Sequence, residues 1–329
     1  MPDSNAAAWP WVRSRLSALR PSARPGTVRP GSGAAVRTAV VTDSAAALPA
    51  AYLAGLAHDG ILTVVPMPVM VGAEIYGEGE DDILETIAVA LASGTGVKTS
   101  RPSPGQFEQA YRAAEQRGFE AVVSVHISGE LSGTADAARL AAARVAIPVD
   151  VVDTETVGMA QGMAVQAAVE AAAAGAGCAD VAAAARAQAA RTRVFFYVPS
   201  LEQLRRGGRI GAAASLVGTM LAIKPILAVD GGRIVPLERV RSAARAVARL
   251  EEIVAAEAVP RPGESVRLAV HHFGNQTEAD GLAARLAVAL PDCPPAQISS
   301  LPAVLAAHAG LGVLAVIVGR GTGGGKLST

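Results

Sequence analysis

Three short segments of the chain gather groups that can bind an anion. Lys98–Pro104 (KTSRPSP) combines three hydroxyls with the free backbone N–H groups of an expected helix start, which suits a carboxylate or a phosphate. Ile127–Thr134 (ISGELSGT) is rich in glycine and hydroxyls, and Arg205–Gly211 (RRGGRIG), with Lys224 and Arg241 beyond it, offers guanidinium groups on a tight turn. Each segment also has a purely structural interpretation, as a capped helix start, a tight turn or a solvated basic turn.

Histidine and aspartate residues offer weaker indications. His308 stands in an apolar stretch, where a lone histidine is more often a satisfied core residue, although it can donate to a buried carboxylate. His271 and His272 are adjacent on an expected strand, so they point to opposite sides and make poor joint metal ligands. Asp43 follows the first expected strand and can bind a metal or a phosphate, but no second carboxylate stands near it in the sequence.

The sequence lacks the motifs of common catalytic sites. It contains no GxSxG elbow, HExxH, Walker A, CxxC or strand-linked GxGxxG. Its two cysteines, Cys178 and Cys293, are isolated and give neither a disulfide framework nor a zinc spacing, as is typical of thiols in a reducing cytoplasm. We therefore expect no catalytic residue, no metal and no cofactor.

Composition excludes further classes of protein. The 329 residues include 71 alanines, and 51% of the chain is hydrophobic but only 3% aromatic. Lys+Arg and Asp+Glu each number 29, so the formal net charge is zero, which argues against nucleic-acid binding. The apolar content excludes a disordered protein. Polar residues, glycines or a proline interrupt the two most apolar stretches, Met163–Ala179 and Leu301–Gly319, too often for a membrane span. The second stretch predicts two short strands that flank a Gly/His loop.

The elements that must position these groups alternate between strand and helix. Ser103, Pro104 and Gln106 predict a helix that begins with a capping box. The same alternation predicts a parallel sheet with helices on its faces. In the first half we expect strands over 38–42, 61–65, 67–71, 119–127 and 149–153, and helices from 48–49, over 82–91, from 104 and over 132–144.

The second half predicts a mixed α/β arrangement. Asp230-Gly231-Gly232 between two short apolar runs, 226–229 and 233–236, is a hairpin signal. We also expect helices over 158–191 (broken at 175–177), 200–206, 212–221, 242–258 and 277–290, and strands over 194–198 and 267–271.

The ends of the chain differ from the rest. Residues 1–36 hold five of the 20 prolines, five arginines and both tryptophans, with no apolar h-region of a signal peptide. We predict a disordered basic extension, and leave open both a transient membrane or partner contact through Trp9 and Trp11 and an upstream choice of start codon. Residues 321–329 predict a flexible Gly-rich tail. Between the ends we expect two domains, 37–157 and 158–320.

Eight segments occur in the order typical of one known family. They are VVTDSAAALP (40–49), KTSRPSPGQF (98–107), ISGELSGT (127–134), VVDTETVGMAQG (151–162), LEQLRRGGRIG (201–211), IKPIL (223–227), GRIVPLERVRS (232–242) and HAGLG (308–312). Each is weak alone, but together, over roughly 37–320, they make the chain resemble the DegV family of bacterial fatty-acid-binding proteins.

The resemblance implies a two-domain α/β protein, with a parallel-sheet N-terminal domain and a mixed α/β C-terminal domain that enclose one long-chain fatty acid between them. It also implies a separate fatty acid kinase, which converts the presented carboxylate into an acyl phosphate for phospholipid synthesis in the cytoplasm. The chain itself is then a lipid carrier without an integral membrane segment, and not an enzyme.

The same resemblance assigns the site residues. The family's carboxylate-binding threonine falls on Thr99 and its motif histidine on His308. The arginines that contact the kinase or phosphate fall on Arg209 and Arg241. The full set expected around the carboxylate is Thr99, Ser100, Ser128, Gly129 and His308.

Three departures from the family pattern affect this assignment. Many members have two adjacent serines where this chain has Ser128-Gly129, so one carboxylate-binding hydroxyl is absent. The common TSQPS reads TSRPS, which places Arg101 either near the carboxylate or in solvent. The HTGPG-like loop reads HAGLG at 308–312 and loses its proline.

Two other functions stay open at this point. One is a phosphoryl- or acyl-handling enzyme that uses Asp43 and the Thr99 and Ser128 loops to bind a phosphorylated metabolite. The other is a structural or regulatory protein that resembles the family but has a filled pocket.

Overall fold

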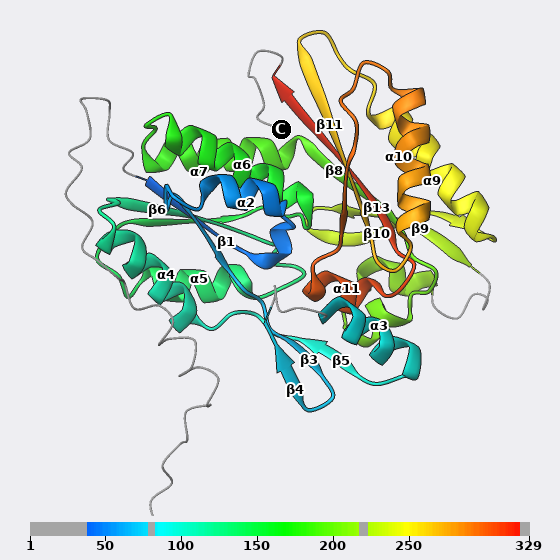
Figure 1. The fold of residues 1–329 in the computed structure, drawn as a ribbon, viewed down its shortest axis with the longest axis horizontal. Helices are drawn as coiled ribbons and strands as arrows, with labels where there is room; N and C mark the ends of the chain where they lie inside the picture. Colours follow the sequence, from blue (N-terminus) through cyan, green and yellow to red (C-terminus); the bar gives the residue numbers. More distant parts are fainter. Residues whose placement is uncertain (1–37, 78–82, 217–222, 323–329) are drawn as a thin grey trace, which may run out of the picture. The chain divides into compact units, whose positions relative to one another are not determined.

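A four-stranded parallel sheet organises the first half of the chain (Figure 1). All six residues of its central strand β1 are buried, as expected for a parallel sheet that helices cover on both faces. The predicted parallel sheet is therefore confirmed. The strand order is β2-β1-β6-β7, formed by Leu62–Val65, Thr38–Asp43, Ala121–His126 and Val149–Asp153. The structure, a computed structural model, describes residues 38–77, 83–216 and 223–322.

Helices cover both faces of this sheet. Helices α4 (Pro104–Gln116) and α5 (Thr134–Ala142) pack on one face, and α6 (Met159–Ala173) and α7 (Cys178–Ala190) on the other (Figure 1). Helix α4 begins with the predicted capping box, in which Ser103 Oγ accepts from the Gln106 N–H. The short helix α2 (Ala50–Leu56) follows β1.

A six-stranded mixed sheet organises the second half. Helices α9 (Ala243–Glu257) and α10 (Gln276–Ala289) pack on one of its faces. The two-residue turn Gly231-Gly232 joins β9 to β10 with both φ angles positive, which is the conformation that hairpin turns of this length require. The strand order is β10-β9-β8-β13-β11-β12, formed by Arg233–Val240, Lys224–Asp230, Thr192–Tyr197, Leu314–Thr322, Glu264–His272 and Gln297–Ser300.

The opposite face of the mixed sheet meets elements from both halves. Helix α6 contacts strands of both sheets. Helices α8 (Glu202–Arg206) and α11 (Ala303–Ala309) pack against each other on this side, and the 3-10 helix Gly211–Leu216 contacts β10. The core cluster on this face therefore joins residues from the first and second halves of the chain.

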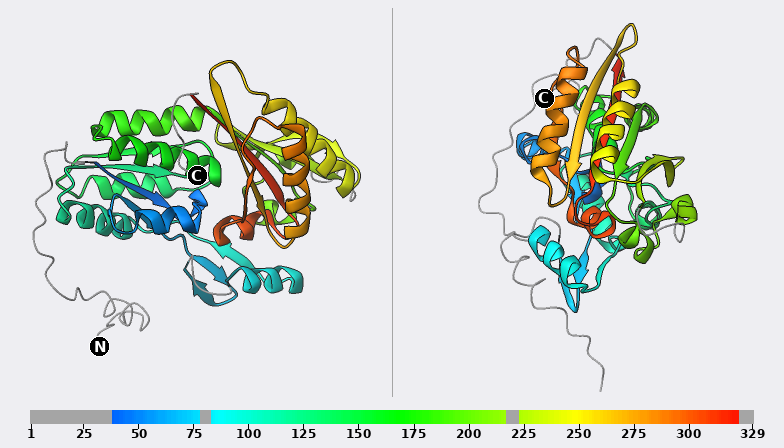
Figure 2. Two further views of the ribbon diagram at one scale, coloured as in Figure 1. Left: turned by 45° about the horizontal axis from the view of Figure 1, so that its top comes forward. Right: turned by 90° about the vertical axis from the view of Figure 1, so that its right-hand side faces the viewer.

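A small third sheet carries first-half residues to this junction. Strands β3 (Val69–Val71) and β5 (Val97–Thr99) contact α11, as does the helix α3 (Ile83–Ser93) that precedes β5 (Figure 2). The third strand of this antiparallel sheet is β4 (Glu74–Tyr76). The end of β5 is thereby held beside the C-terminal part of the chain.

Some local predictions were wrong. The segment Leu301–Gly319 holds helix α11 and then β13, rather than two strands around a loop, because Ala303–Ala309 contains four alanines, which favour a helix, and buries one side. The helix expected over 132–144 is shorter, Thr134–Ala142, with Gly133 as its N-cap. Strand β13 also runs to Thr322, beyond the predicted start of the tail.

Other predictions fall partly or wholly outside the described residues. These are the extension 1–36 with its tryptophans, most of the tail, the start of the helix expected over 82–91 and the end of the one expected over 212–221, whose described part is a 3-10 helix. A domain boundary between residues 157 and 158 stays a prediction. Among the described helices, none has the length and apolarity needed to cross a membrane.

Candidate functional site

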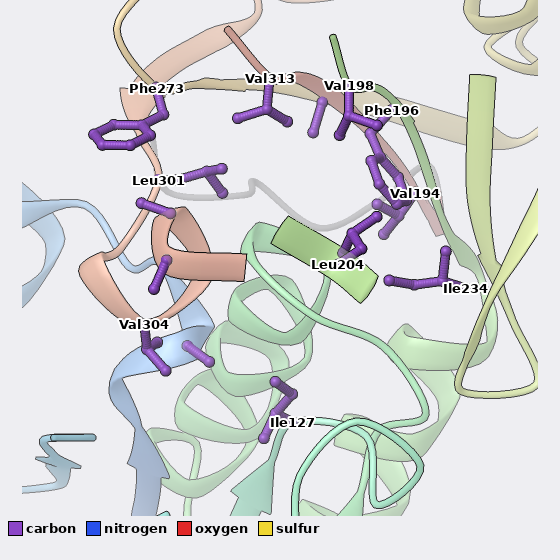
Figure 3. Close-up of a cluster of buried hydrophobic side chains, with 14 of the residues drawn as sticks. Ile127, Val194, Phe196, Val198, Leu204, Ile234, Phe273, Leu301, Val304 and Val313 are labelled. Atoms are coloured by element: carbon purple, nitrogen blue, oxygen red, sulfur yellow. The ribbon is translucent and has the colours of Figure 1, made fainter. Parts of the chain in front are cut away.

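A cavity that is partly open to solvent lies between the mixed sheet and the first-half loops. Its wall is mostly aliphatic and includes Val194 and Phe196 of β8, Leu204 of α8, Ile234 of β10 and Val304 of α11. These side chains belong to one buried cluster, to which Ile127, just after β6, also belongs (Figure 3). The cavity is thus an apolar chamber built from segments far apart in the sequence.

Two of the predicted site residues meet at the wall of this cavity. Thr99 ends strand β5, and His308 lies in the last turn of α11. The Thr99 Oγ1 and His308 Nε2 atoms are 2.7 Å apart, and both residues line the cavity. A hydroxyl and a neutral imidazole can each donate a hydrogen bond, so the pair gives an apolar chamber a polar end.

His308 is held in its neutral form. Burial, together with the smaller effect of the positive charge of Arg209, lowers the pKa of its imidazole to about 4. Because the imidazole is uncharged, it acts as a hydrogen-bonding group, and Arg209 supplies the positive charge of the site.

Arg209 also lines the cavity, and the loops around it fix its position. Its Nε donates to the Leu131 carbonyl at 3.0 Å, and its Nη1 donates to the Gly207 carbonyl at 2.6 Å. Within the described part of the chain its Nη2 has no hydrogen-bond partner. That nitrogen remains available to an anionic group in the cavity.

The other predicted carboxylate residues lie in different places. Ser100 is exposed and lines the cavity, with its hydroxyl donating to the Arg101 carbonyl. Ser128 is buried, but its hydroxyl donates to the Gly232 carbonyl at 2.8 Å, so it ties the loop after β6 to the β9–β10 turn. Neither Ser128 nor Gly129 is among the residues that line the cavity.

Gly129 has a structural reason to lack a side chain. Its N–H donates to Asp153 Oδ2, and a Cβ added there would lie 2.6 Å from that same oxygen. A serine here, as the family resemblance leads one to expect, would require Asp153 to move. Arg241, the second predicted arginine, is exposed just after β10 and does not line the cavity.

A second histidine lies in the cavity wall, a position that the sequence did not indicate. His271 lies on β11, and its Nε2 accepts from the Met159 N–H at 3.0 Å while its Nδ1 is 3.0 Å from Ser299 Oγ. Burial lowers the pKa of His271 to about 4. This imidazole joins the start of α6 to the mixed sheet, a contact between distant segments that no local motif signals.

Asp43 belongs to a different hydrogen-bond network. Its Oδ2 is 2.9 Å from His126 Nδ1 and accepts from the Ile127 N–H, and its Oδ1 accepts from the Ala45 N–H. The hydrogen-bond network continues from His126 Nε2 to Ser124 Oγ, 2.7 Å away, and from Ser124 Oγ to the Tyr111 hydroxyl. Asp43 is fully buried and does not line the cavity, so it cannot contact a ligand there.

His126 too was missed, although one signal was present. Ser124 and His126 are two residues apart on a strand, so their side chains share a face. His126 and Asp43 end neighbouring strands, but that adjacency depends on strand order. In the described ranges no group of three His, Cys, Asp or Glu side chains is placed to hold a metal ion.

Fold and site together define an α/β protein with a partly open apolar cavity whose wall carries a hydroxyl–imidazole pair. The family model described as "Uncharacterised protein, DegV family" matches residues 37–320. A DegV domain-containing protein of Streptomyces coelicolor is 45% identical over 280 residues, which cover 85% of this chain and 97% of the relative. A DegV domain-containing protein of Mycobacterium bovis is 38% identical over 283 residues, which cover 86% of this chain and 97% of that relative. The chain therefore belongs to the DegV family.

Solved structures agree with this assignment. A DegV family protein from Thermus thermophilus, described by its fatty acid binding, is 32% identical and superposes with a TM-score of 0.78 over 86% of this chain and 99% of that one. DegV from Bacillus subtilis, described as a fatty acid binding protein, is 28% identical with a TM-score of 0.74, and the match covers 86% of this chain and 99% of that one. The α/β fold expected from the family resemblance is confirmed.

Proposed function

We propose that this protein binds one long-chain fatty acid, with the acyl chain in the aliphatic cavity and the carboxylate at Thr99 and His308. The observation that carries the proposal is the pairing of these two side chains, 2.7 Å apart, at the wall of a cavity lined mainly by apolar residues. Fatty acid binding by the Thermus thermophilus and Bacillus subtilis relatives supports it.

The physical chemistry of the site suits such a ligand. Each buried CH₂ contributes about 0.8 kcal/mol, so a long acyl chain gains most of its affinity from the aliphatic wall. A buried carboxylate needs hydrogen bonds, and Thr99 and His308 carry groups that can donate them. A filled pocket, as expected for a merely structural relative, does not fit the open space at this position.

Native mass spectrometry of the protein purified from cells tests the proposal, together with lipid extraction. We expect a mass increment of one fatty acid, and uptake of palmitate after delipidation. Ala315→Phe, which adds a ring at the cavity wall, should reduce uptake, whereas Val288→Phe on the exposed side of α10 should not. An apo mass with no extractable lipid and no palmitate uptake would refute fatty-acid binding.

We further propose that the bound carboxylate is presented to a fatty acid kinase and carried onward as an acyl phosphate. Support comes from the position of Arg209 in the cavity wall and from Arg241, which is exposed and free to meet a partner. Arg209→Ala should impair phosphorylation by the kinase and spare lipid retention. If Arg209→Ala instead empties the cavity, the division of roles between Arg209 and the Thr99–His308 pair is wrong.

A further inference from the structure

Arg101 lies where the cavity meets solvent. It follows Thr99 and Ser100 in the chain and lines the cavity, yet it is exposed. Its guanidinium lies against Gly133, because a Cβ on that glycine would be 2.7 Å from Arg101 Nη1. The charge is therefore placed beside the loop that follows β6, at the rim of the chamber.

The Arg101 charge lacks a partner group among the described residues. In the described ranges the Arg101 guanidinium has no hydrogen bond and no ion pair, whereas Arg112 and Arg186 are each paired with a carboxylate. An unpaired guanidinium at the mouth of a ligand cavity is free to bind an anion in bidentate fashion.

A second guanidinium lies deeper in the same cavity. Arg209 Nε donates to the Leu131 carbonyl, two residues before the glycine that Arg101 touches. The charge of Arg209 reaches His308 and lowers the pKa of its imidazole, and Arg101 is not among the groups that do so. The two cations thus follow one another from the Thr99–His308 pair toward the rim.

We propose that Arg101 is a specificity-determining residue that favours a dianionic headgroup, as in an acyl phosphate, over the single charge of a carboxylate. This inference rests on the proposed fatty-acid function. When the carbonyl group occupies the Thr99–His308 pair, a phosphoryl group attached to it must extend beyond that pair. The rim, where Arg101 is unpaired, is the part of the cavity that can meet the added charge.

The test compares two lipids of equal chain length, palmitate and hexadecyl phosphate, at pH 8, where a phosphate monoester is a dianion because its second pKa is about 6. Affinities are measured by competition with a fluorescent fatty acid. Arg101→Gln restores the residue of the common family motif. We expect it to weaken hexadecyl phosphate binding about fivefold, in keeping with a partly exposed ion pair, and palmitate binding by less than about twofold.

Two further variants sharpen the result. Gly133→Ala keeps the charge but places a Cβ where the Arg101 guanidinium lies, and the glycine's φ of −71° allows an alanine there. It should reproduce part of the selective loss. Arg186→Gln removes one charge from a surface pair outside the cavity, and should change neither affinity.

The outcomes separate the two proposals. If the wild-type protein binds neither lipid, the proposed function fails and this inference fails with it. If the wild-type protein binds both, but Arg101→Gln weakens them equally or not at all, the fatty-acid function stands and the assignment of Arg101 is overturned. Because the described residues give the Arg101 side chain neither a hydrogen bond nor an ion pair, the variant should unfold at the wild-type temperature, which circular dichroism checks.

Discussion

His126 is a buried imidazole and His308 a half-buried one, and both bond to a hydroxyl, but their surroundings differ. His126 has partners at both ring nitrogens, Asp43 on one side and Ser124 on the other, and no exposed surface. His308 has Thr99 at Nε2 and, in the described part of the chain, no hydrogen-bond partner at Nδ1. The first set is closed in the core of the parallel sheet, and the second is open to a cavity.

The difference teaches where to look for ligand binding in this molecule. A closed set of buried polar groups satisfies itself and stabilises the fold, so it leaves no capacity for another molecule. An open set at a cavity wall keeps that capacity. The closed set still supports the site indirectly, because Asp43 accepts from the N–H of Ile127, which lines the cavity.

The largest effect that tests this contrast is expected at Asp43. Asp43→Ala leaves His126 and two backbone N–H groups buried without their acceptor, which typically costs about 3–5 kcal/mol of unfolding free energy. Urea denaturation measures this loss. Asp136→Ala, at an exposed ion pair, is the control and should cost less than about 1 kcal/mol. A stable Asp43→Ala protein that no longer binds lipid would contradict the structural role.

The second effect concerns pH. Burial lowers the folded-state pKa of His271 to about 4, against an ordinary value near 6.5, so between these values the unfolded chain binds more protons. Its contribution to stability is complete above pH 6.5, and is lost as the pH falls from 6.5 to 4. The expected loss is about 3 kcal/mol.

Denaturation curves between pH 4 and pH 7.5 check this prediction. His271→Gln should lower stability at neutral pH and flatten the profile, because it removes the group that titrates. Burial also lowers the pKa of His308 to about 4, so His308→Ala should flatten part of the same profile. If the unfolding free energy of the wild-type protein instead rises as the pH falls through this range, the two imidazoles are not held in their neutral forms.

The third effect lies at the far end of the closed network. Tyr111→Phe removes the hydroxyl that is 2.8 Å from Ser124 Oγ and leaves the ring in place. One buried hydrogen bond is worth about 1 kcal/mol, so the variant should be less stable by that amount and bind palmitate normally. Thr99→Val at the cavity should show the reverse, with little loss of stability and weaker binding. Equal behaviour of the two variants would remove the distinction between the networks.

The sequence indicated one of these two networks and not the other. Motif order placed Thr99 and His308 in one site, and the structure brings their side chains together although 209 positions separate them. Asp43 was weighed as a metal or phosphate ligand because its partner was not visible. That partner, His126, becomes its neighbour only when β1 and β6 pair, which is a property of strand order and not of local sequence.

The fold shows the same division between local and distant information. The alternation of strand and helix predicted the parallel sheet, and the two glycines at 231–232 predicted the β9–β10 hairpin, because both signals are local. Helix α11 was mistaken for a strand since a seven-residue apolar run is too short for its period to decide. Ser128 faces the hairpin turn through a contact that spans 104 positions, which no pattern could supply.

The smallest effect is expected at Gly207, next to the open pair. A Cβ on Gly207 would overlap the His308 imidazole, while its φ of −76° suits any residue. Its neighbour Gly208 is the opposite case, with open space around it but a φ of +71° that favours glycine. Gly207→Ala should therefore weaken palmitate binding about fivefold with normal stability, whereas Gly208→Ala should lower stability by about 1 kcal/mol and spare affinity.

A double-mutant cycle decides whether Gly207 acts through His308. If the added methyl group works only by displacing the imidazole, then Gly207→Ala combined with His308→Ala should bind palmitate no more weakly than His308→Ala alone. Additive losses in the double variant would mean that the methyl group narrows the cavity itself. The Thr99–His308 pair would then be positioned by β5 and α11 alone, and the turn at Gly207-Gly208 would have no part in positioning it.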